Sequence, residues 1–496
     1  MLSMFAGRGE LMNAAFITAV ILLICAVSSK VLYRFGIPIL ILFLTIGMLM
    51  GSEGPGGIYF DNAALAENIC NLALLIIIFS GGFDTNWKAA RPVALASGIL
   101  ATLGVFLTAA FVGIFTHFAL GFTLLEGMLL GSIISSTDYA SVFAILRSQQ
   151  SDLKSNLAPM LEMESGSNDP AAYMFTVIFL GLLTGESQNI GLLLLTQIAV
   201  GTFFGVVVGK AAVWLINNIN LDIDGLYPIM VIGMALLTYS GAGMLGGNGF
   251  LAGYITGIIM GNSRLVKKVS LVRYFDGLSW LMQILLFMTL GLLVFPSQLL
   301  SVVVAGVLVA IFLIFVARPL VVFLVLSVFK RPFNEQLLVS WVGFRGAASI
   351  VFATYPLTAG LPVAEQIFNI VFFVALVSVL LQGTLFIPIA KKLDLVEPEG
   401  TVFRTFTDYS GDIYAELLEV MIPEGSPLAG KAIMDLDIPP NVLIMMIKRE
   451  GKIITCRGKT ILREGDTLMM AGDHEVLLEI DAWARSPQDN SLTKPE

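Results

Sequence analysis

Charged residues are scarce in this chain. Asp, Glu, Lys and Arg make up 13% of its 496 residues, whereas a soluble domain carries about 25%. Hydrophobic residues reach 57%, and the mean hydropathy is +0.88. This composition excludes a soluble globular protein and predicts an integral membrane protein in contact with lipid. The net charge of −8, without a basic patch, also argues against nucleic acid as a partner.

Histidine and cysteine are equally rare. The two histidines and three cysteines lie far apart in the sequence, at His117, His474, Cys25, Cys70 and Cys456. None of them forms a CxxC pair or another metal-ligand spacing. The sequence also lacks a P-loop and a GxSxG motif, so we do not expect an enzyme, a catalytic residue or a cofactor.

Long hydrophobic runs dominate instead. About thirteen have the length of a membrane-crossing helix, so we expect an all-α polytopic protein of the inner (plasma) membrane. They lie near residues 12–29, 36–52, 63–81, 92–116, 122–146, 158–183, 189–216, 226–245, 248–262, 275–296, 298–329, 335–357 and 365–390. Basic residues gather in alternate loops, and Lys391 and Lys392 end the last run. By the positive-inside rule, this pattern predicts an N-terminus outside and a C-terminus in the cytoplasm.

One of these runs contains an unusual polar group. Glu164, Ser165, Asn168 and Asp169 share one broad helical face, because residues four apart lie above one another. Pro170 removes a backbone donor beside Asp169 and loosens the helix there. An ionised carboxylate in hydrocarbon costs about 2.5–3.5 kcal/mol on insertion scales, so two acids in one span must face inward. We favour a site for a small cation or a proton over a polar contact that only holds helices together.

Polar residues also interrupt two other runs. SSTD at 135–138 breaks the run at 122–146, and GFRG at 343–346 breaks the run at 335–357. Interrupted helices in separate halves of a chain indicate a transporter site between inverted repeats. For SSTD, a continuous helix with a polar patch is the alternative. Arg318 lies at the centre of a further apolar run and needs an acidic partner, for which Glu164 is the first candidate.

The composition changes after residue 396, where charged residues become frequent. Four short β-rich runs, together with KAIMDLD and HEVLLEIDAWA as short helices, predict a small α+β domain. We therefore expect a transmembrane domain at 1–395, a cytoplasmic domain at 396–484 and a disordered tail at 485–496.

With these residues in place, roughly residues 10–395 resemble the cation/proton antiporter superfamily, in its NhaP-type and NHE-type branch. Four motifs in the same order carry the resemblance: SSTD at 135–138, ESGSND at 164–169, ARPL at 317–320 and GFRGAAS at 343–349. MIPEGSPLAGKAIMDLDIP and REGDTLMMAGD resemble a TrkA-C (RCK-C) regulatory domain. The resemblance implies an NhaA-like fold with two inverted repeats and two broken, crossing helices. It also implies a homodimer and an elevator movement of a core bundle.

The resemblance further implies roles for individual residues. Asp169 would take either the proton or the cation. Asp138, the carbonyl of Thr137 and Ser165 would complete the shell around a monovalent cation. Asn168 would steady the site, and an Asn at this position implies electroneutral one-for-one exchange.

Other residues would have structural roles by the same resemblance. Glu164 would pair with Arg318, and Arg345, flanked by Gly343 and Gly346, would stabilise the broken helix. The chain also departs from the family. Some members carry a glutamate near the end of the third span, where this chain has IFSGGFD, so the ion selectivity stays open.

Competition for one buried carboxylate is enough to couple two ions. If the site moves only when it is neutralised, a cation and a proton are carried against each other. We expect K⁺/H⁺ exchange, chiefly because of the C-terminal domain, with Na⁺/H⁺ exchange as the alternative. A ligand-gated K⁺ efflux channel is the alternative of another class, but it would need a filter, and no TVGYG-like stretch occurs.

The ligand of the C-terminal domain is a separate question. The domain lacks the GxGxxG fingerprint of a dinucleotide site. Its partner stays open. It could be a regulatory nucleotide, an ion, another small ligand, a protein, or only its dimer mate.

Overall fold

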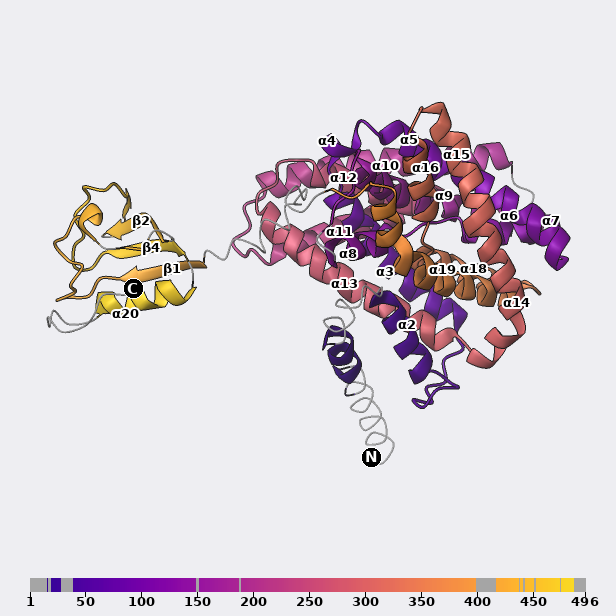
Figure 1. Cartoon of the computed structure of the whole chain (residues 1–496), viewed down its shortest axis with the longest axis horizontal. Helices are drawn as coiled ribbons and strands as arrows, with labels where there is room; N and C mark the ends of the chain where they lie inside the picture. The colour runs from indigo at the N-terminus through magenta and orange to yellow at the C-terminus, as the bar shows by residue number, and fades with distance from the viewer. Residues whose placement is uncertain are drawn as a thin grey trace. The chain divides into compact units, whose positions relative to one another are not determined.

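The computed structural model describes residues 16, 19–27, 39–148, 151–186, 189–397, 416–436, 438–439, 442–449, 452–472 and 474–485. The chain divides into two compact units, Met1–Phe403 and Arg404–Glu496 (Figure 1). Much of the first predicted span, and nearly all of the predicted tail, lie outside the described residues.

Helices form the secondary structure of the first unit in its described part, apart from an isolated β-bridge between Leu153 and Val396. Its helices are α2 (Ile39–Met50), α3 (Ala63–Asp84), α4 (Trp87–Ala90), α5 (Ala94–Ile99), η1 (Leu100–Gly104), α6 (Val105–Leu120), α7 (Leu124–Ile133), α8 (Tyr139–Ser148), α9 (Leu157–Leu183), α10 (Ile190–Asn218), α11 (Leu226–Met244), α12 (Gly249–Gly261), α13 (Lys268–Leu293), α14 (Pro296–Phe312), η2 (Leu313–Ala317), α15 (Arg318–Val328), α16 (Phe333–Trp341), α17 (Ala347–Phe352), α18 (Thr354–Thr358) and α19 (Ala364–Lys392). Among the described residues, seven continuous helices are long and apolar enough to cross a membrane. The number of crossings stays a prediction, although helices occupy each predicted run from 36–52 onward.

Two helices are interrupted at the predicted positions. α7 ends at Ile133 and α8 begins at Tyr139, while α16 ends at Trp341 and α17 begins at Ala347. The unwound backbone between them needs hydrogen-bond partners, because water is absent inside a membrane. One is supplied by the other unwound segment: the Asp138 N–H donates to the Phe344 carbonyl at 2.8 Å. The two interrupted helices therefore meet at their unwound segments.

The same succession of elements occurs twice in the first unit. A helix with a π-helical turn (η1 or η2) precedes an interrupted helix, which is followed by a long helix containing an internal proline, Pro170 in α9 and Pro388 in α19. The two π-containing helices pack against each other, with the Phe115 and Phe312 rings stacked at 4.1 Å. π-Helical turns are frequent at functional sites, and here both lie in helices next to the interrupted ones.

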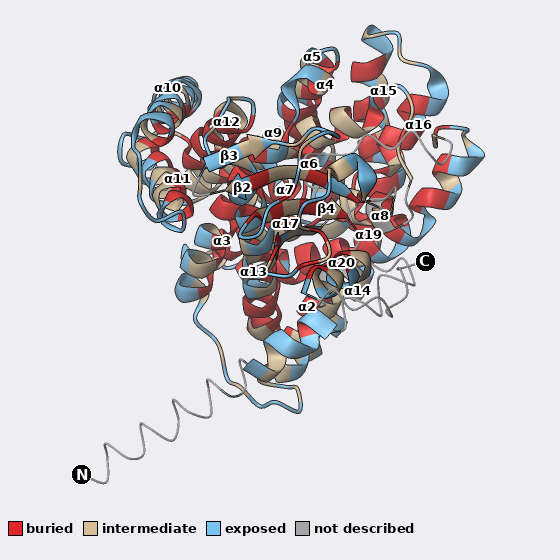
Figure 2. Cartoon of the chain, turned by 90° about the vertical axis from the view of Figure 1, so that its left-hand side faces the viewer, coloured by how far each residue is buried: buried red, intermediate tan, exposed pale blue. Residues whose placement is uncertain are grey.

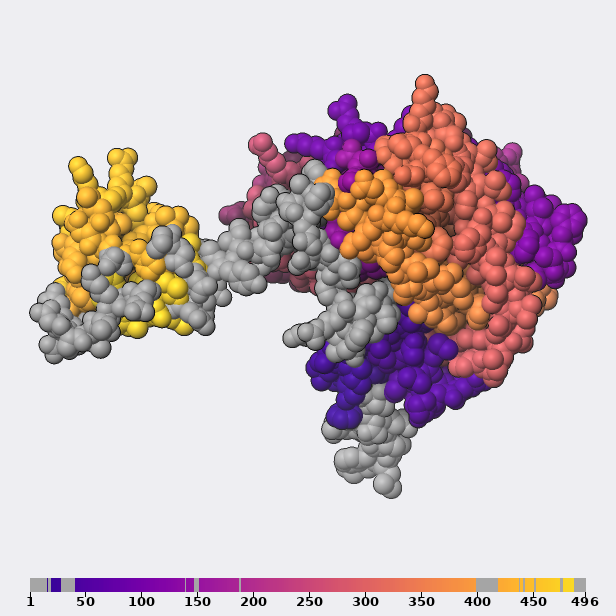
Figure 3. All heavy atoms as spheres, viewed as in Figure 1, coloured from indigo at the N-terminus to yellow at the C-terminus, as the bar shows by residue number. Residues whose placement is uncertain are grey.

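The helices fall into two groups by their packing. The α3 group comprises α2, α3 and α10–α13, and the α9 group comprises α5–α9 and α14–α19. Within the α3 group, Phe79 of α3 packs on Phe275 of α13, with ring centroids 5.2 Å apart. Within the α9 group, α14 lies along α19 (Figure 3). Much of α10 is exposed (Figure 2), which leaves an apolar helix face for lipid or another chain.

The second unit is a small α+β domain, as predicted. Its four-stranded antiparallel sheet has the order β1-β4-β2-β3, formed by β1 (Glu416–Met421), β2 (Leu443–Arg449), β3 (Lys452–Thr455) and β4 (Thr467–Gly472). Helix α20 (His474–Arg485) packs its apolar face on the sheet and completes the core.

One predicted helix of this unit is wrong. KAIMDLD forms only the short 3₁₀ turn η4 (Ile433–Asp435). The Ile433 and Met434 N–H groups donate to the carbonyls of Thr460 and Gly458, at 3.0 and 2.8 Å. Because these bonds join the segment to a neighbouring loop, its backbone donors serve a tertiary contact rather than a helix.

An ion pair joins strand β2 to the loop that precedes β4 in the same sheet. Arg449 of β2 donates from Nε and Nη2 to the two carboxylate oxygens of Asp466, each at 2.7 Å. The Arg463 N–H adds a third bond at 2.8 Å. Burial alone would raise the pKa of Asp466, but the bonds from Arg449 and Arg463 outweigh it and hold this pKa below its ordinary value.

Candidate ion-binding site

The unwound segments and the middle of α9 form the candidate site. Ser136 donates its hydroxyl proton to an oxygen of the Asp169 carboxylate. The Ser165 hydroxyl donates to the Thr137 carbonyl, and Asn168 Nδ2 donates to Thr137 Oγ1 at 2.6 Å. The structure therefore brings together four of the residues that the family resemblance implies for cation binding: Asp169, Thr137, Ser165 and Asn168.

Asp138 lies at the same crossing but already has local partners. Its carboxylate accepts from the Ser141 hydroxyl at 2.6 Å and from the Ser141 N–H at 3.3 Å, as a helix N-cap does. It also packs against Gly346, where a Cβ atom would lie 2.4 Å from the carboxylate. Only glycine fits at this position, which explains why the second unwound segment can approach Asp138 so closely.

The structure places Glu164 and Arg318 in direct contact. Arg318 Nη1 and Nη2 donate to the two Glu164 oxygens at 2.5 and 3.0 Å, and Nη2 also reaches the Val339 carbonyl at 3.3 Å. The two residues are only 1% and 4% exposed. Gly343 leaves room for this arginine, since a Cβ atom there would lie 3.1 Å from Arg318 Nε.

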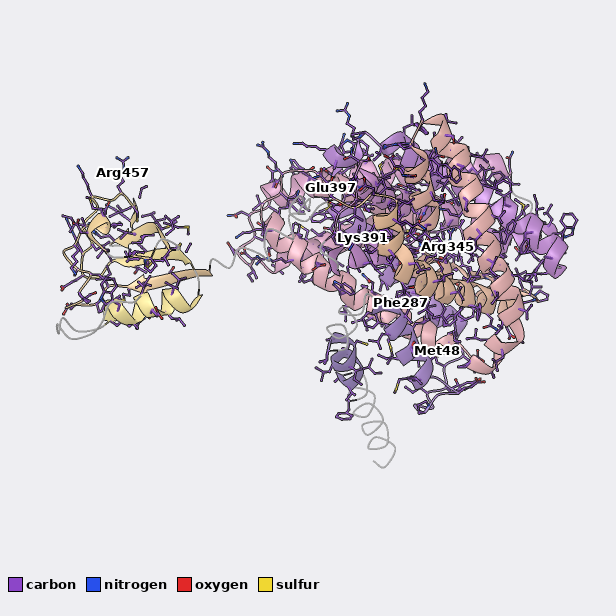
Figure 4. All side chains as sticks on the ribbon, in the orientation of Figure 1. Met48, Phe287, Arg345, Lys391, Glu397 and Arg457 are labelled. Atoms are coloured by element: carbon purple, nitrogen blue, oxygen red, sulfur yellow. The ribbon has the colours of Figure 1, made fainter. Side chains whose placement is uncertain are left out.

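Arg345 satisfies the carbonyls at the end of α7. Its Nη1 donates to the Ser135 and Ser136 carbonyls at 2.6 and 3.0 Å, and the residue is 1% exposed. Its backbone N–H donates to the Ser378 hydroxyl of α19 at 3.0 Å. Figure 4 shows Arg345 inside the helical unit. A guanidinium at a helix C-terminus offsets the negative end of the helix dipole, and this geometry fits the predicted role of Arg345 in supporting the interruption.

Sequence reasoning missed several residues around the site. Asn248 Nδ2 of the α12 N-cap donates to the Pro170 carbonyl at 2.7 Å, and Tyr254 of α12 packs on Gly166. Glu162 lies two turns before Asp169 on α9. Neither Asn248 nor Tyr254 stands out in its apolar segment, because its role depends on a different helix. Glu162 could have been found from the sequence, because it is a third acid in the same apolar span.

The charges at the crossing nearly cancel. Asp138, Asp169 and Glu164 carry three negative charges when ionised, and Arg318 and Arg345 carry two positive charges. One negative charge is left, and either one monovalent cation or one proton would neutralise it. Buried acids at two interrupted membrane helices define the class of protein: a secondary transporter for a small ion.

The comparisons with known proteins identify the family. The family described as "Sodium/hydrogen exchanger, transmembrane" matches residues 18–392, and the TrkA-C domain matches residues 417–485. A K⁺/H⁺ antiporter, NhaP of Alkalimonas amylolytica, is 36% identical over 92% of this chain and 80% of its own length. A K⁺/H⁺ antiporter, NhaP2 of Shewanella sp. (strain ANA-3), is 35% identical over 97% of this chain and 84% of its own.

A solved structure has the same membrane fold. It is the sodium proton antiporter MjNhaP1 of Methanocaldococcus jannaschii at pH 8, with a TM-score of 0.67 and 25% identity over 77% of this chain and 99% of that one. The chain belongs to the sodium/hydrogen exchanger family and carries a C-terminal TrkA-C domain. It is a monovalent cation:proton antiporter and not an enzyme.

Proposed function

We propose that the chain exchanges one K⁺ for one proton across the inner (plasma) membrane, electroneutrally. The single uncompensated charge at the crossing carries this proposal. A monovalent cation or a proton would each bring the site to neutrality, and a neutral site crosses hydrocarbon at the lowest cost. A divalent ion would leave an excess positive charge and would usually need more carboxylates.

Asp169 is the residue for which the two ions compete. Its carboxylate is held by Ser136, and the Thr137 carbonyl and the Ser165 and Asn168 side chains lie beside it. The Asn168 Oδ1 atom is buried and has no hydrogen-bond partner within the described residues, which leaves it free to face an ion. Asp138 contributes its charge and its remaining lone pairs from the other side of the crossing.

The alternating movement is an elevator-type displacement of the α9 group against the α3 group. The proposed ligands and both arginines belong to the α9 group, so the site would move as one body. The α9 group meets the α3 group through polar contacts, such as Tyr355 Oη to Asn71 Oδ1 at 2.8 Å, and through aromatic contacts, such as Tyr173 of α9 on Phe250 of α12 at 5.1 Å. An elevator movement would have to break and re-form both kinds of contact.

The choice of K⁺ over Na⁺ follows the named relatives. Those named as K⁺/H⁺ antiporters are 33–36% identical to this chain. Those named as Na⁺ antiporters are 28% identical over 67% of this chain, for NhaS2, and 25% identical, for MjNhaP1. Na⁺/H⁺ exchange is the alternative.

The proposal extends to assembly and regulation. The TrkA-C domain lies in the cytoplasm and regulates exchange by binding a small ligand, such as a nucleotide or an ion, or a protein. The exposed apolar faces of the α3 group meet lipid and a second copy of the chain in a homodimer.

The test is exchange in liposomes that contain a trapped pH dye, with K⁺ or Na⁺ added outside. Wild-type protein should move protons when K⁺ is added, with and without a voltage clamp, because one charge crosses in each direction. Asp169→Asn should abolish this movement, whereas Asp224→Asn should not, since Asp224 is an exposed partner of Lys267. Cation flux without proton movement would instead support a ligand-gated channel.

A further inference from the structure

A second polar cluster lies on α9 before the ion site. Glu162 and Asp169 are seven residues apart, so they lie on the same side of the helix, two turns from each other. The half-buried Glu162 carboxylate is within hydrogen-bonding reach of the Thr85 hydroxyl, which follows the end of α3. Thr85 is 2% exposed and donates its proton to the Gly81 carbonyl at 2.8 Å, so its lone pairs stay available.

Tyr254 of α12 closes this cluster. It occupies the gap between two glycines, Gly82 of α3 and Gly166 of α9. A Cβ atom on Gly82 would lie 2.4 Å from the Tyr254 carbonyl, and one on Gly166 would lie 2.7 Å from the Tyr254 hydroxyl. The hydroxyl is thereby directed onto α9, beside Ser167, and the charges of Glu162 and Asp169 both act on it.

The environment of the Tyr254 hydroxyl indicates that a ligand or a water binds there. The residue is 3% exposed, and its hydroxyl makes no well-aligned hydrogen bond within the described part of the chain, although the Ser167 and Thr85 hydroxyls lie within reach of it. A buried hydroxyl of this kind is costly unless a water or an ion fills the space in front of it. Close contacts with Gly82 and Gly166 hold Tyr254 between α3 and α9, where the residue is buried.

Further charge lies beyond Glu162 at the end of α3. Asp84 is close enough to Glu162, Asp276 and Lys268 for each to act on it electrostatically. When the three acids are ionised, they outnumber the one lysine and make this approach negative, which raises the local concentration of cations.

We propose that Glu162, Thr85, Ser167 and Tyr254 form a second binding station for a monovalent cation, which an incoming ion occupies before it reaches Asp169. One carboxylate and three hydroxyl oxygens suit K⁺ or Na⁺ that has kept part of its water. The inference rests on the proposed function, because it assigns an entry step to the same exchange. The carboxylate supplies the attraction, and the Tyr254 hydroxyl oxygen orients the water or ion.

Equilibrium binding of radioactive Rb⁺, as a K⁺ analogue, to the purified full chain tests the station without transport. Asp169→Asn should keep a class of Rb⁺ sites, and adding Glu162→Gln should remove it. Tyr254→Phe in the Asp169→Asn background should weaken this residual binding roughly threefold, since it removes one oxygen and little volume. Glu162→Asp should restore binding, and Asp224→Asn should leave it unchanged.

The outcomes separate the two proposals. Loss of all binding in Asp169→Asn alone, or wild-type binding in Glu162→Gln, would overturn the second station. Retained binding in a protein that moves no protons would support the station while removing the proposed exchange. In active liposomes, Glu162→Gln should raise the KM for K⁺ roughly fivefold with an almost unchanged maximal rate. A lower maximal rate with an unchanged KM would count against the station.

Discussion

Glu164 and Arg318 form a two-point contact, at 2.5 and 3.0 Å, between α9 and the first residue of α15, which follows the π-helical turn η2. Both side chains are almost fully buried. Neither can reach water, so each depends on the other for its charge to be tolerated. The pair therefore ties the helix that carries Asp169 to the helix that precedes the second interruption.

Breaking this pair on one side should destabilise the protein strongly. Glu164→Gln leaves a buried guanidinium without its counter-charge, which costs about 3–5 kcal/mol. We expect a clearly lower unfolding temperature in detergent, measured by intrinsic fluorescence. The double variant Glu164→Leu/Arg318→Met should unfold at a higher temperature than either single variant, because both charges are removed together. A double variant as unstable as the singles would contradict this account of the pair.

Gly346 should not accept a methyl group. The added Cβ of Gly346→Ala would meet the Asp138 carboxylate at 2.4 Å, so one unwound segment must shift. Overpacking of this kind costs about 1–3 kcal/mol, and the shift should abolish exchange in the liposome assay. Gly277→Ala is the matched control, since nothing lies within 4 Å of a Cβ atom there. Normal exchange in Gly346→Ala would show that the crossing tolerates a wider spacing.

A link between the two helix groups should stop exchange. Tyr355 of α18 and Asn71 of α3 are joined by one hydrogen bond of 2.8 Å, and an elevator movement must separate them. Cysteines at both positions, in a chain without its own cysteines, can be joined by a short reducible thiol reagent. We expect proton movement to cease on linking and to return on reduction.

The control for this link lies inside one group. Phe115 and Phe312 stack at 4.1 Å within the α9 group, so cysteines linked there should leave exchange intact. Full activity after linking positions 71 and 355 would exclude a displacement of the two groups along this contact.

The stability of the C-terminal domain should fall at low pH. The pKa of Asp466 is lower in the folded domain than in the unfolded chain, because Arg449 and Arg463 stabilise its charged form. This stabilisation is therefore complete above the unfolded pKa of about 3.9 and is lost as the pH falls through the lower folded value. Asp466→Asn should cost about 2 kcal/mol at neutral pH.

Hydrogen exchange of the β4 amides in the full chain provides the measurement. In the wild type, the β4 amides should lose their protection against exchange below about pH 4. In Asp466→Asn, they should be weakly protected at neutral pH, and their protection should change less with pH. Asp435→Asn, outside the pair, should behave as wild type. A variant that keeps the wild-type pH profile would show that the pair contributes nothing to this stability.

Much of the site could be predicted from local sequence because membrane helices tolerate so few polar residues. Glu164 and Arg318 each stood out in apolar runs, and an unpaired charge there is so costly that pairing was the natural expectation. The interruptions at SSTD and GFRG were visible for the same reason. Tyr254 could not be predicted, since its role depends on the glycines of two other helices. KAIMDLD was predicted as a helix from its pattern of apolar residues. In the structure its backbone N–H groups instead form hydrogen bonds with the loop at Gly458 and Thr460.

The hydrogen bond from the Asp138 N–H to the Phe344 carbonyl has a consequence for biosynthesis. Its two ends lie in different halves of the chain, so the first half is inserted while the partner of Asp138 has not yet been made. Until then the unwound residues of the first half have unsatisfied backbone groups, and the carbonyls that accept from Arg345 also lack this hydrogen-bond donor. The candidate ion site should therefore assemble late, and the first half alone should be a substrate for quality-control proteases rather than a half-transporter.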